Sequence, residues 1–524
     1  MKYRIGIDVG GTNTDAVILN SRDSVVAKTK CPVTYDIIHS IRDAVKTVLE
    51  ESELSPTHIS HAMLGTTQVT NAIIERRNLN RVGLIRIGAP ATRAIPPLTG
   101  WPRELKEFVQ SASVLVKGGH EFDGRLISPL DEDAIRRFLD DNANRISAVA
   151  VTSVFAPVNA DHEQWVQDLV TTQYPHLSVS LSHEIGSIGL LERENATVLN
   201  AAVTQVARQA SLAFRDALSD LGISAELFLA QNDGTLMAMD YALRFPILTV
   251  ACGPTNSMRG AAYLSHISEG VIIDVGGTSS DIGVIRGGFP RESAIAVEVG
   301  GVRTNFRMPD LIALGLGGGS RVHMTDNEEI VLGPDSVGYE LIHESRVFGG
   351  DTLTFTDVAV SEGYARIGTS SPKISSYLSQ NAYQSALRMI EEGIDRIKTN
   401  AQPLPLIAVG GGSALLPDKI FGVSEVIRPQ HYDVANAIGA AIAQVSGRID
   451  RIYSMSGRRR EDVLREAEGQ ARAEAVRAGA DPSSLELVEV EEIPLAYLPS
   501  NASRVRVTVA GKLGGQVSDE LDTL

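Results

Sequence analysis

The sequence Asp8-Val9-Gly10-Gly11-Thr12-Asn13-Thr14-Asp15 returns nearly unchanged as Asp274-Val275-Gly276-Gly277-Thr278-Ser279-Ser280-Asp281. Aliphatic residues precede and follow each copy, so both copies predict a strand, a tight Gly-Gly-Thr turn and a second strand. Glycines allow such a turn to present several backbone N–H groups to an anion, and the Thr hydroxyl adds a donor. The repeat therefore predicts two phosphate-binding hairpins that hold one nucleotide from opposite sides.

Other glycine-rich phosphate loops do not match this pattern. A dinucleotide-binding fold needs Gly-x-Gly-x-x-Gly running into a helix, and a P-loop ends in Gly-Lys-Ser/Thr before a helix. Here β-branched and aliphatic residues follow Asp15 and Asp281, and Val25 to Lys30 predicts a further strand. For either copy alone, an ordinary hairpin turn is the alternative. Agreement at six of eight positions favours a pair of phosphate sites.

Strands and helices alternate along most of the chain. Apolar spacing predicts a helix over Ile37 to Glu51, a buried strand over Val82 to Ile87, and a long helix over Leu191 to Leu221. The charged stretch Glu461 to Gly479 predicts another helix, with short strands after it. This order is typical of an α/β protein whose helices pack on both faces of its sheets.

The composition is that of a globular protein, with 524 residues, 43% hydrophobic and 21% charged. A net charge of −16 argues against nucleic acid or an anionic membrane as a partner, because both favour clustered Lys and Arg. The two cysteines, Cys31 and Cys252, do not suggest a disulfide scaffold, and the N-terminus has no signal-peptide pattern. We therefore expect a cytoplasmic protein.

Several further motifs follow one another in a recognisable order. They are Gly65-Thr66-Thr67, Glu192 to Thr197, Gln231 to Gly234, Gly253-Pro254, Gly315 to Ser320 and Leu332 to Ser336. With the two hairpins, they make the chain similar to the A subunit of the hydantoinase/5-oxoprolinase family. That family lies in the superfamily of acetate kinase, sugar kinases, heat-shock chaperone ATPases and actin. The resemblance runs to about Gly447 and is weaker beyond it.

This resemblance implies a two-lobed actin-like ATPase fold built from duplicated ribonuclease H-like lobes. We expect an N-terminal α/β lobe over residues 1–190, with the phosphate-1 loop. A second α/β lobe over residues 191–448 would carry the phosphate-2 loop and an adenosine loop at Gly410 to Gly412. Residues 449–524 would form a small α+β C-terminal tail. For the third glycine loop, a plain strand-to-helix turn is the alternative.

The resemblance also implies that ATP lies between the lobes with Mg²⁺ or Mn²⁺. The expected nucleotide contacts are Gly10, Gly11, Thr12, Asn13, Gly276, Gly277, Thr278, Ser279, Gly410, Gly411 and Gly412. Asp8 and Asp274 would orient the metal through water, and Asp15 and Asp281 would position donors or water. Hydrogen bonds that close the turn are an equally good reading of Asp15 and Asp281. Asn71, Glu75 and Arg193 are the expected substrate-binding residues.

For the activity, the resemblance implies that the γ-phosphoryl group of ATP activates the oxygen of a cyclic amide, such as a hydantoin or 5-oxoproline, for ring opening. It also implies a separate B subunit, and we expect an oligomer. An acetone carboxylase type of reaction, a small-molecule kinase and a non-catalytic nucleotide switch are the alternatives.

The chain departs from its relatives at three places: Asn13, Ala251 to Asn256 and Val337 to His343. The substrate therefore stays unassigned, and so does the role of Gly315 to Ser320. A separate loop groups His120, Glu121 and Asp123, which are potential ligands or acid/base residues. Its spacing does not match His-Glu-x-x-His, so a solvated loop is the simpler interpretation.

Overall fold

The computed structural model describes residues 2–33, 37–186, 188–293, 297–305, 308–325, 327, 329–495 and 502–514. In the N-terminal lobe, β1 (Tyr3–Val9) pairs antiparallel with β2 (Asn13–Leu19), which pairs with β3 (Val25–Pro32). On its other side β1 runs parallel to β4 (Ile59–Thr66), followed by β9 (Glu226–Ala230). The Gly-Gly-Thr turn joins β1 to β2, as predicted.

The second lobe repeats this arrangement. Strand β11 (Gly270–Val275) pairs antiparallel with β12 (Ser280–Arg286), and β13 (Phe289–Pro290) extends that side. Parallel strands β19 (Leu404–Val409) and β20 (Val423–Ile427) follow β11 on the other side. Both lobes thus have the order third, second, first, fourth, fifth strand. This duplication confirms the predicted two-lobed actin-like fold.

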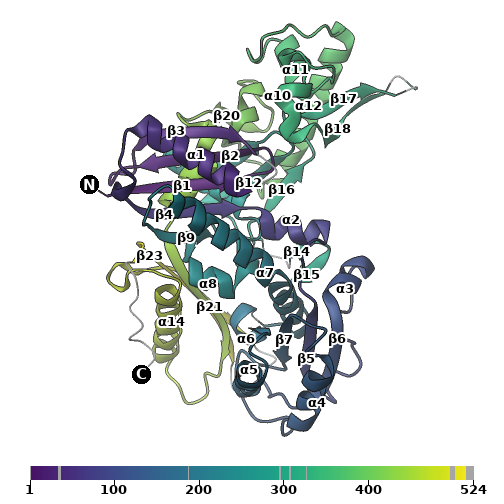
Figure 1. The fold of residues 1–524 in the computed structure, drawn as a ribbon, viewed down its shortest axis with the longest axis vertical. Helices are drawn as coiled ribbons and strands as arrows, with labels where there is room; N and C mark the ends of the chain where they lie inside the picture. The colour runs from purple at the N-terminus through teal and green to yellow at the C-terminus, as the bar shows by residue number, and fades with distance from the viewer. Residues whose placement is uncertain are drawn as a thin grey trace.

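The first sheet continues beyond β9 through four more strands. These are β10 (Leu236–Ala238), β21 (Val445–Tyr453), β23 (Ser503–Gly511) and the edge strand β22 (Glu486–Pro494). Helix α14 (Arg460–Arg477) packs beside β21 and β23, at the lower left of Figure 1. The nine-stranded sheet therefore crosses the expected boundaries at residues 190 and 448. Pairing between distant strands leaves no local pattern in a sequence, which explains the difference.

A separate parallel sheet is inserted after α2 (Gln68–Glu75). Its strands, in spatial order, are β6 (Gln110–Lys117), β5 (Val82–Ala89), β7 (Ala148–Ser153) and β8 (Ser178–Leu181). Helices α4 (Glu132–Asn142) and α5 (Asp161–Gln173) accompany it at the lower right of Figure 1. The long helix α7 (Leu190–Asp220) follows. Within the structure, a fully buried ion pair between Arg86 and Glu194 (2.6 Å) fastens this helix to β5.

Two helices cross closely between the lobes: α9 (Cys252–Ser265) and α13 (Ala435–Ile442). A Cβ atom added at Gly260 would lie 1.8 Å from the Ala435 carbonyl oxygen, and one added at Gly439 would lie 1.8 Å from that of Asn256. Small residues are therefore required at this crossing. Helix α13 ends at Ile442, and β21 begins shortly after it at Val445.

The remaining helices are α1 (Ile37–Ser52), α3 (Arg103–Val109), α6 (Ser182–Ile185), α8 (Met239–Arg244), α10 (Leu341–Glu344), α11 (Phe355–Ser361) and α12 (Ser376–Ile397). The remaining strands are β14 (Val297–Val299), β15 (Val302–Thr304), β16 (Leu311–Leu314), β17 (Ser320–Met324) and β18 (Ile330–Ser336). Among the described residues, none of the helices combines the length and apolar character needed to cross a bilayer.

Candidate functional site

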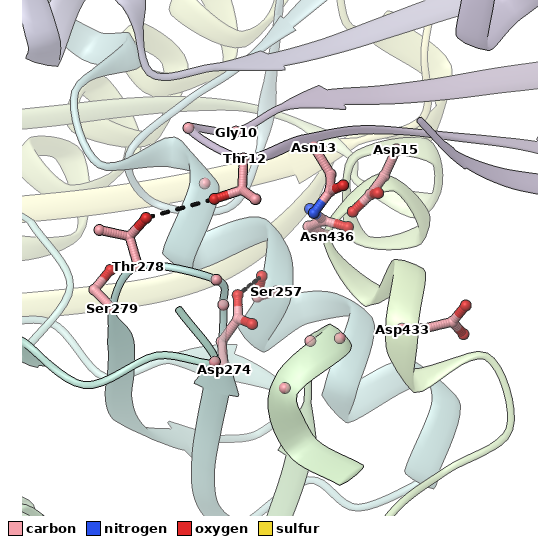
Figure 2. A pocket seen from close by; sticks show the side chains of 18 of the residues that line it. Gly10, Thr12, Asn13, Asp15, Ser257, Asp274, Thr278, Ser279, Asp433 and Asn436 are labelled. Atoms are coloured by element: carbon pink, nitrogen blue, oxygen red, sulfur yellow. Dashed lines mark hydrogen bonds between the residues drawn. The ribbon is translucent and has the colours of Figure 1, made fainter. Parts of the chain in front are cut away.

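A cleft of about 540 Å³ brings the two hairpins and the third glycine loop together. Its walls include Asp8, Gly10 to Asn13, Asp15, Asp274, Gly276 to Ser279, Asp281 and Gly410 to Gly412. Figure 2 shows that the hairpins approach from opposite lobes, with Thr12 facing Thr278. All of the nucleotide, metal and catalytic residues expected from the sequence therefore line one cavity.

The two turns have the same internal geometry. The Gly10 N–H donates to the Asn13 carbonyl oxygen (3.0 Å), and the Gly276 N–H donates to that of Ser279 (2.9 Å). The hydroxyl oxygens of Thr12 and Thr278 lie 3.5 Å apart across the cleft. A Cβ atom added at Gly11 would meet nothing within 4 Å, so this turn is open to the cavity. Such opposed turns can bind a chain of phosphates from two sides.

Asp8 in β1 and Asp274 in β11 accept hydrogen bonds from side chains of the crossing helices α9 and α13. Asn436 donates to Asp8 (3.0 Å), with Asn256 farther away at 3.4 Å, while Ser257 donates to Asp274 (2.5 Å). Burial raises the pKa of Asp8 to about 6, and the neighbouring Asp15 charge contributes. Burial also raises the pKa of Asp274. A cation bound near these two carboxylates would stabilise their charged forms and offset the free-energy cost of their burial.

The carboxylates of Asp15 in β2 and Asp281 in β12 have different neighbours. Lys30 donates to both oxygens of Asp15, at 2.6 and 2.7 Å. Within the part of the chain that the structure describes, the Asp281 carboxylate forms neither an ion pair nor a hydrogen bond. Burial and the Asp274 charge raise the pKa of Asp281 to about 7. The second lobe therefore presents more uncompensated negative charge to the cleft than the first.

This donor set fits a divalent cation held mainly through water. The described residues contain no cluster of three His, Cys, Asp or Glu side chains that would coordinate a metal directly. Asp8 and Asp274 are oxygen ligands of the kind that Mg²⁺ takes in ones or twos beside substrate phosphates, with several waters retained. Among the described residues of the cleft wall, one ammonium, that of Lys30, stands among five carboxylates, those of Asp8, Asp15, Asp274, Asp281 and Asp433.

The third glycine loop lies directly against the second hairpin. Gly410 has φ +82°, and a Cβ atom there would lie 2.1 Å from Oδ1 of Asp274. Only glycine fits such a position. An apolar wall adjoins the loop, formed by Leu341, Phe348, Ile367 and Leu415. Sequence reasoning missed this wall, because its residues come from separate parts of the chain and Leu341 lies in a segment that departs from the family pattern.

The Gly315 to Ser320 cluster, whose role the sequence left open, packs against the backbone of the second hairpin. The Gly318 N–H donates to the Gly276 carbonyl oxygen (3.0 Å), and the Gly319 N–H donates to that of Gly277 (2.7 Å). A Cβ atom at Gly317 would lie 2.7 Å from backbone atoms of Gly277 and Thr278. These glycines therefore allow two backbone segments to pack in direct contact.

The three expected substrate residues lie in different places. Asn71 lines the cleft from α2, next to Thr67 and Gly253. Glu75, at the end of α2, is 53% exposed beside Arg77 and does not line the cleft. Arg193 is buried in α7, where it donates to Ser182 (2.9 Å) and to the Ser153 carbonyl (2.6 Å). Of the three, only Asn71 lies near the predicted phosphates.

The loop with His120, Glu121 and Asp123 is also outside the cleft wall. The His120 ring packs on that of His162 (4.6 Å between centroids), and Asp123 pairs with Arg125 (2.8 Å). In contrast, Lys30, Ser257 and Asn436 belong to the cleft although no motif indicated them. Each is brought there by long-range packing, which sequence spacing does not encode.

Two family models match the chain. One, for the hydantoinase/oxoprolinase N-terminal region, matches residues 4–173, and the other, for hydantoinase/oxoprolinase, matches residues 193–368. Together they extend over both hairpins and over β5, β6 and β7 of the inserted sheet.

Individual relatives are similar over most of this chain. A caprolactamase subunit alpha from Pseudomonas jessenii is 27% identical over 396 residues, which cover 70% of this chain and 55% of the relative. An acetophenone carboxylase gamma subunit from Aromatoleum aromaticum is 28% identical over 395 residues, covering 69% of this chain and 53% of the relative. The chain thus spans about half the length of these relatives.

A solved structure has the same fold along nearly the entire chain. The crystal structure of an ATP-dependent caprolactamase from Pseudomonas jessenii superposes with a TM-score of 0.76 at 20% sequence identity. The superposition covers 97% of this chain and 88% of the other.

Proposed function

This chain belongs to the hydantoinase/oxoprolinase family, and we propose that it is an ATP-dependent subunit that phosphorylates a cyclic amide and so activates it for ring opening. One observation carries this proposal. Two hairpins of the same geometry meet across a cleft that also contains a third glycine loop and five carboxylates. This arrangement suits a nucleoside triphosphate better than any other common ligand.

In this proposal Gly10 to Asn13 and Gly276 to Ser279 bind the phosphates, and Gly410 to Gly412 border the adenosine. Asp8 and Asp274 would hold Mg²⁺ or Mn²⁺ through water, and the cation would neutralise charge on the transferred phosphoryl group. Asn71 is the proposed contact for the amide, because it lines the same cleft from α2. Glu75 and Arg193 are not proposed as substrate contacts, since neither lines that cleft.

Phosphorylation would lower the barrier to hydrolysis of a cyclic amide. An unstrained lactam resists attack by water because its nitrogen donates electrons into the carbonyl. When the amide oxygen attacks the γ-phosphorus and ADP leaves, the product is a phosphorylated imidate. Water then adds to the ring carbon, the ring C–N bond breaks, and the nitrogen leaves as an amine. A second water hydrolyses the resulting acyl phosphate to a carboxylate and free phosphate. The cleft residues supply the positioning and charge stabilisation that phosphoryl transfer requires.

A separate B subunit would complete the reaction. Two relatives are named as subunits, an alpha and a gamma subunit, and this chain spans about half of their length. We therefore propose that the chain performs activation, and that a partner subunit of the same family promotes attack by water. The proposal places the assembly in the cytoplasm, where ATP is abundant, and we expect an oligomer.

An acetone carboxylase type of reaction is the second candidate. The acetophenone carboxylase gamma subunit is as similar to this chain as the caprolactamase subunit is. In that case the phosphorylated molecule would be bicarbonate or a ketone instead of a cyclic amide. The nucleotide cleft would serve both reactions in the same way.

Phosphate release from ATP tests these proposals. The native protein, copurified with any partner chain, is assayed with hydantoins, 5-oxoproline and larger lactams, and separately with ketones plus bicarbonate. We expect stoichiometric phosphate release that depends on a cyclic amide and requires the partner for ring opening. Release that depends only on a ketone and bicarbonate would establish the carboxylase candidate instead. A stable phosphorylated product would identify a small-molecule kinase. Complete hydrolysis by the isolated chain would disprove the division of labour between subunits.

A further inference from the structure

A second cavity, of about 280 Å³, lies apart from the nucleotide cleft. Its wall combines His183 to Gly186, which follow β8, with Gln231 to Asp233 and the Ser446 to Arg451 part of β21. It shares Asp233, Asn305, Ser446, Arg448 and Arg506 with a larger neighbouring cavity of about 1150 Å³. Residues of the Gln231 to Gly234 motif, which has no role in the nucleotide site, thus meet His183 and Glu184 at one place.

His183 is held in a fixed orientation at this cavity. Its Nδ1 lies 2.7 Å from a carboxylate oxygen of Glu163, and its backbone N–H donates to the same oxygen (3.0 Å). Glu163 is fully buried and also accepts hydrogen bonds from Ser182 (2.5 Å) and from the Ser153 N–H (2.7 Å).

This pairing determines which nitrogen of the imidazole is available. Burial alone would raise the pKa of Glu163, but its hydrogen bonds and the Arg193 charge outweigh burial and lower this pKa, so Glu163 is a carboxylate at neutral pH. A carboxylate accepts a hydrogen bond, which places the ring proton of neutral His183 on Nδ1. In that neutral form, Nε2 is a hydrogen-bond acceptor on the ring edge opposite the buried glutamate. Because His183 lines the cavity, that acceptor is available to a ligand.

Arg451 supplies an unpaired positive charge to the same cavity. Three other arginines in the wall have carboxylate partners: Arg448 pairs with Glu292, Arg477 with Glu474 and Arg506 with Glu491. Among the described residues, the half-buried Arg451 guanidinium forms no ion pair or hydrogen bond. A guanidinium presents two parallel N–H groups that match a carboxylate, so an organic acid is its natural ligand.

We propose that this cavity is a second binding site, for a small organic carboxylate that also carries an N–H group. Arg451 binds the carboxylate, and Nε2 of His183 accepts from the N–H. Two kinds of molecule have this chemistry, a cyclic amide that bears a carboxylate and the amino acid formed when such a ring opens. The link to these two molecules rests on the proposed function, whereas the ligand class follows from Arg451 and His183 alone.

Isothermal titration of the full chain without nucleotide tests the proposal. The probes are 5-oxoproline, 2-pyrrolidinone, which has the same ring without the carboxylate, and L-glutamate, the opened acid. We expect at least one of the two acids to bind, and 2-pyrrolidinone to bind about tenfold more weakly or not at all, because a charge-assisted pair is lost. Binding of 5-oxoproline alone would identify the site as one for the closed ring, and binding of glutamate alone as one for the product.

Variants identify the two groups. Arg451→Met is expected to weaken binding of the acid about tenfold or more, and Arg451→Lys less, because an ammonium keeps the charge without the paired donors. His183→Gln is expected to weaken binding too. Arg465→Met is the matched control, since Arg465 is 76% exposed on α14, and it should leave binding unchanged. Thermal melting shows whether each variant is folded.

Three results would overturn the proposal: failure of both acids to bind, equal binding of 5-oxoproline and 2-pyrrolidinone, or unchanged affinity in the folded Arg451 variants. An Asp8→Asn variant separates this site from the nucleotide site. It is expected to lose nucleotide turnover and to keep binding of the acid, so each proposal can fail without the other.

Discussion

Asp8 and Asp274 occupy equivalent positions in the two hairpins, and so do Asp15 and Asp281, but their neighbours differ. Lys30 neutralises Asp15, whereas Asp281 has no such partner among the described residues. Asp8 is bound by an amide from α13, and Asp274 by a hydroxyl from α9. The duplicated motif therefore does not produce two chemically equal halves. The repeat predicted the four carboxylates, but the residues that set their charge come from other parts of the chain.

Asp8→Asn is expected to lower nucleotide turnover about 100-fold or more, because an electrostatic contact to the phosphates and their cation is removed. The fold should survive, since Asn436 and Asn256 can still hydrogen-bond an amide at this position. Steady-state turnover and thermal melting measure the two effects. Unchanged turnover would remove Asp8 from the proposed mechanism.

Asp281 should make the stability of the metal-free and nucleotide-free chain depend on pH. Its pKa is raised from 3.8 to about 7 on folding, so the folded state binds its proton more tightly than the unfolded state does. Stability attributable to Asp281 is then full below about pH 4 and falls as the pH rises to about 7, by up to about 4 kcal/mol. Asp281→Asn should therefore stabilise the chain at pH 8 and much less at pH 5. Urea unfolding of both proteins at the two pH values measures this, and an equal effect at both would contradict it.

Some secondary elements follow from local sequence and others do not. Each hairpin was predictable because runs of aliphatic residues flank a Gly-Gly-Thr turn within a few positions, and residues 37–52 form an amphipathic helix as expected. Pairing of β9 and β21 with the first sheet joins residues that are far apart, and no local periodicity encodes it. Arg193 was expected at the substrate through its motif, but it binds Ser182 and Ser153 in the interior. A sequence motif can single out a residue such as Arg193 without indicating which contact that residue makes.

Close packing of α9 on α13 predicts that a substitution at Gly260 is destabilising, whereas a substitution at Gly469, outside this crossing, is not. Gly260→Ala would place its Cβ 1.8 Å from the Ala435 carbonyl oxygen and force the helices apart, at a cost of roughly 1–3 kcal/mol. Nucleotide affinity should fall as well, because these helices carry Ser257 and Asn436. Gly469→Ala, in α14, meets nothing within 4 Å and should stabilise the chain by up to about 1 kcal/mol. Denaturant unfolding compares them, and equal effects would refute the role of the crossing.

The lobes touch at the hairpins and at the α9 and α13 crossing, so a ligand in the cleft contacts parts of the chain hundreds of residues apart. The first lobe contributes Gly11, where an added Cβ atom meets nothing within 4 Å, and the second lobe contributes Gly411, where it meets the Lys30 side chain at 4.0 Å. The apolar wall near Phe348 closes the same cleft. Since this wall and the shared sheet were not predictable, the sequence indicated a nucleotide clamp without defining where the base or the substrate lies.

Titration of the full chain with Mg²⁺ and a non-hydrolysable ATP analogue tests whether both lobes form one nucleotide site. We expect a single nucleotide to bind each chain. Gly11→Val and Gly411→Val each add a side chain to the open cleft without a clash and, from opposite lobes, should each weaken binding about tenfold or more while the melting temperature is kept. Gly469→Ala should bind the analogue like the original chain. Absence of binding, or unchanged affinity in either cleft variant, would contradict a site shared by the two lobes.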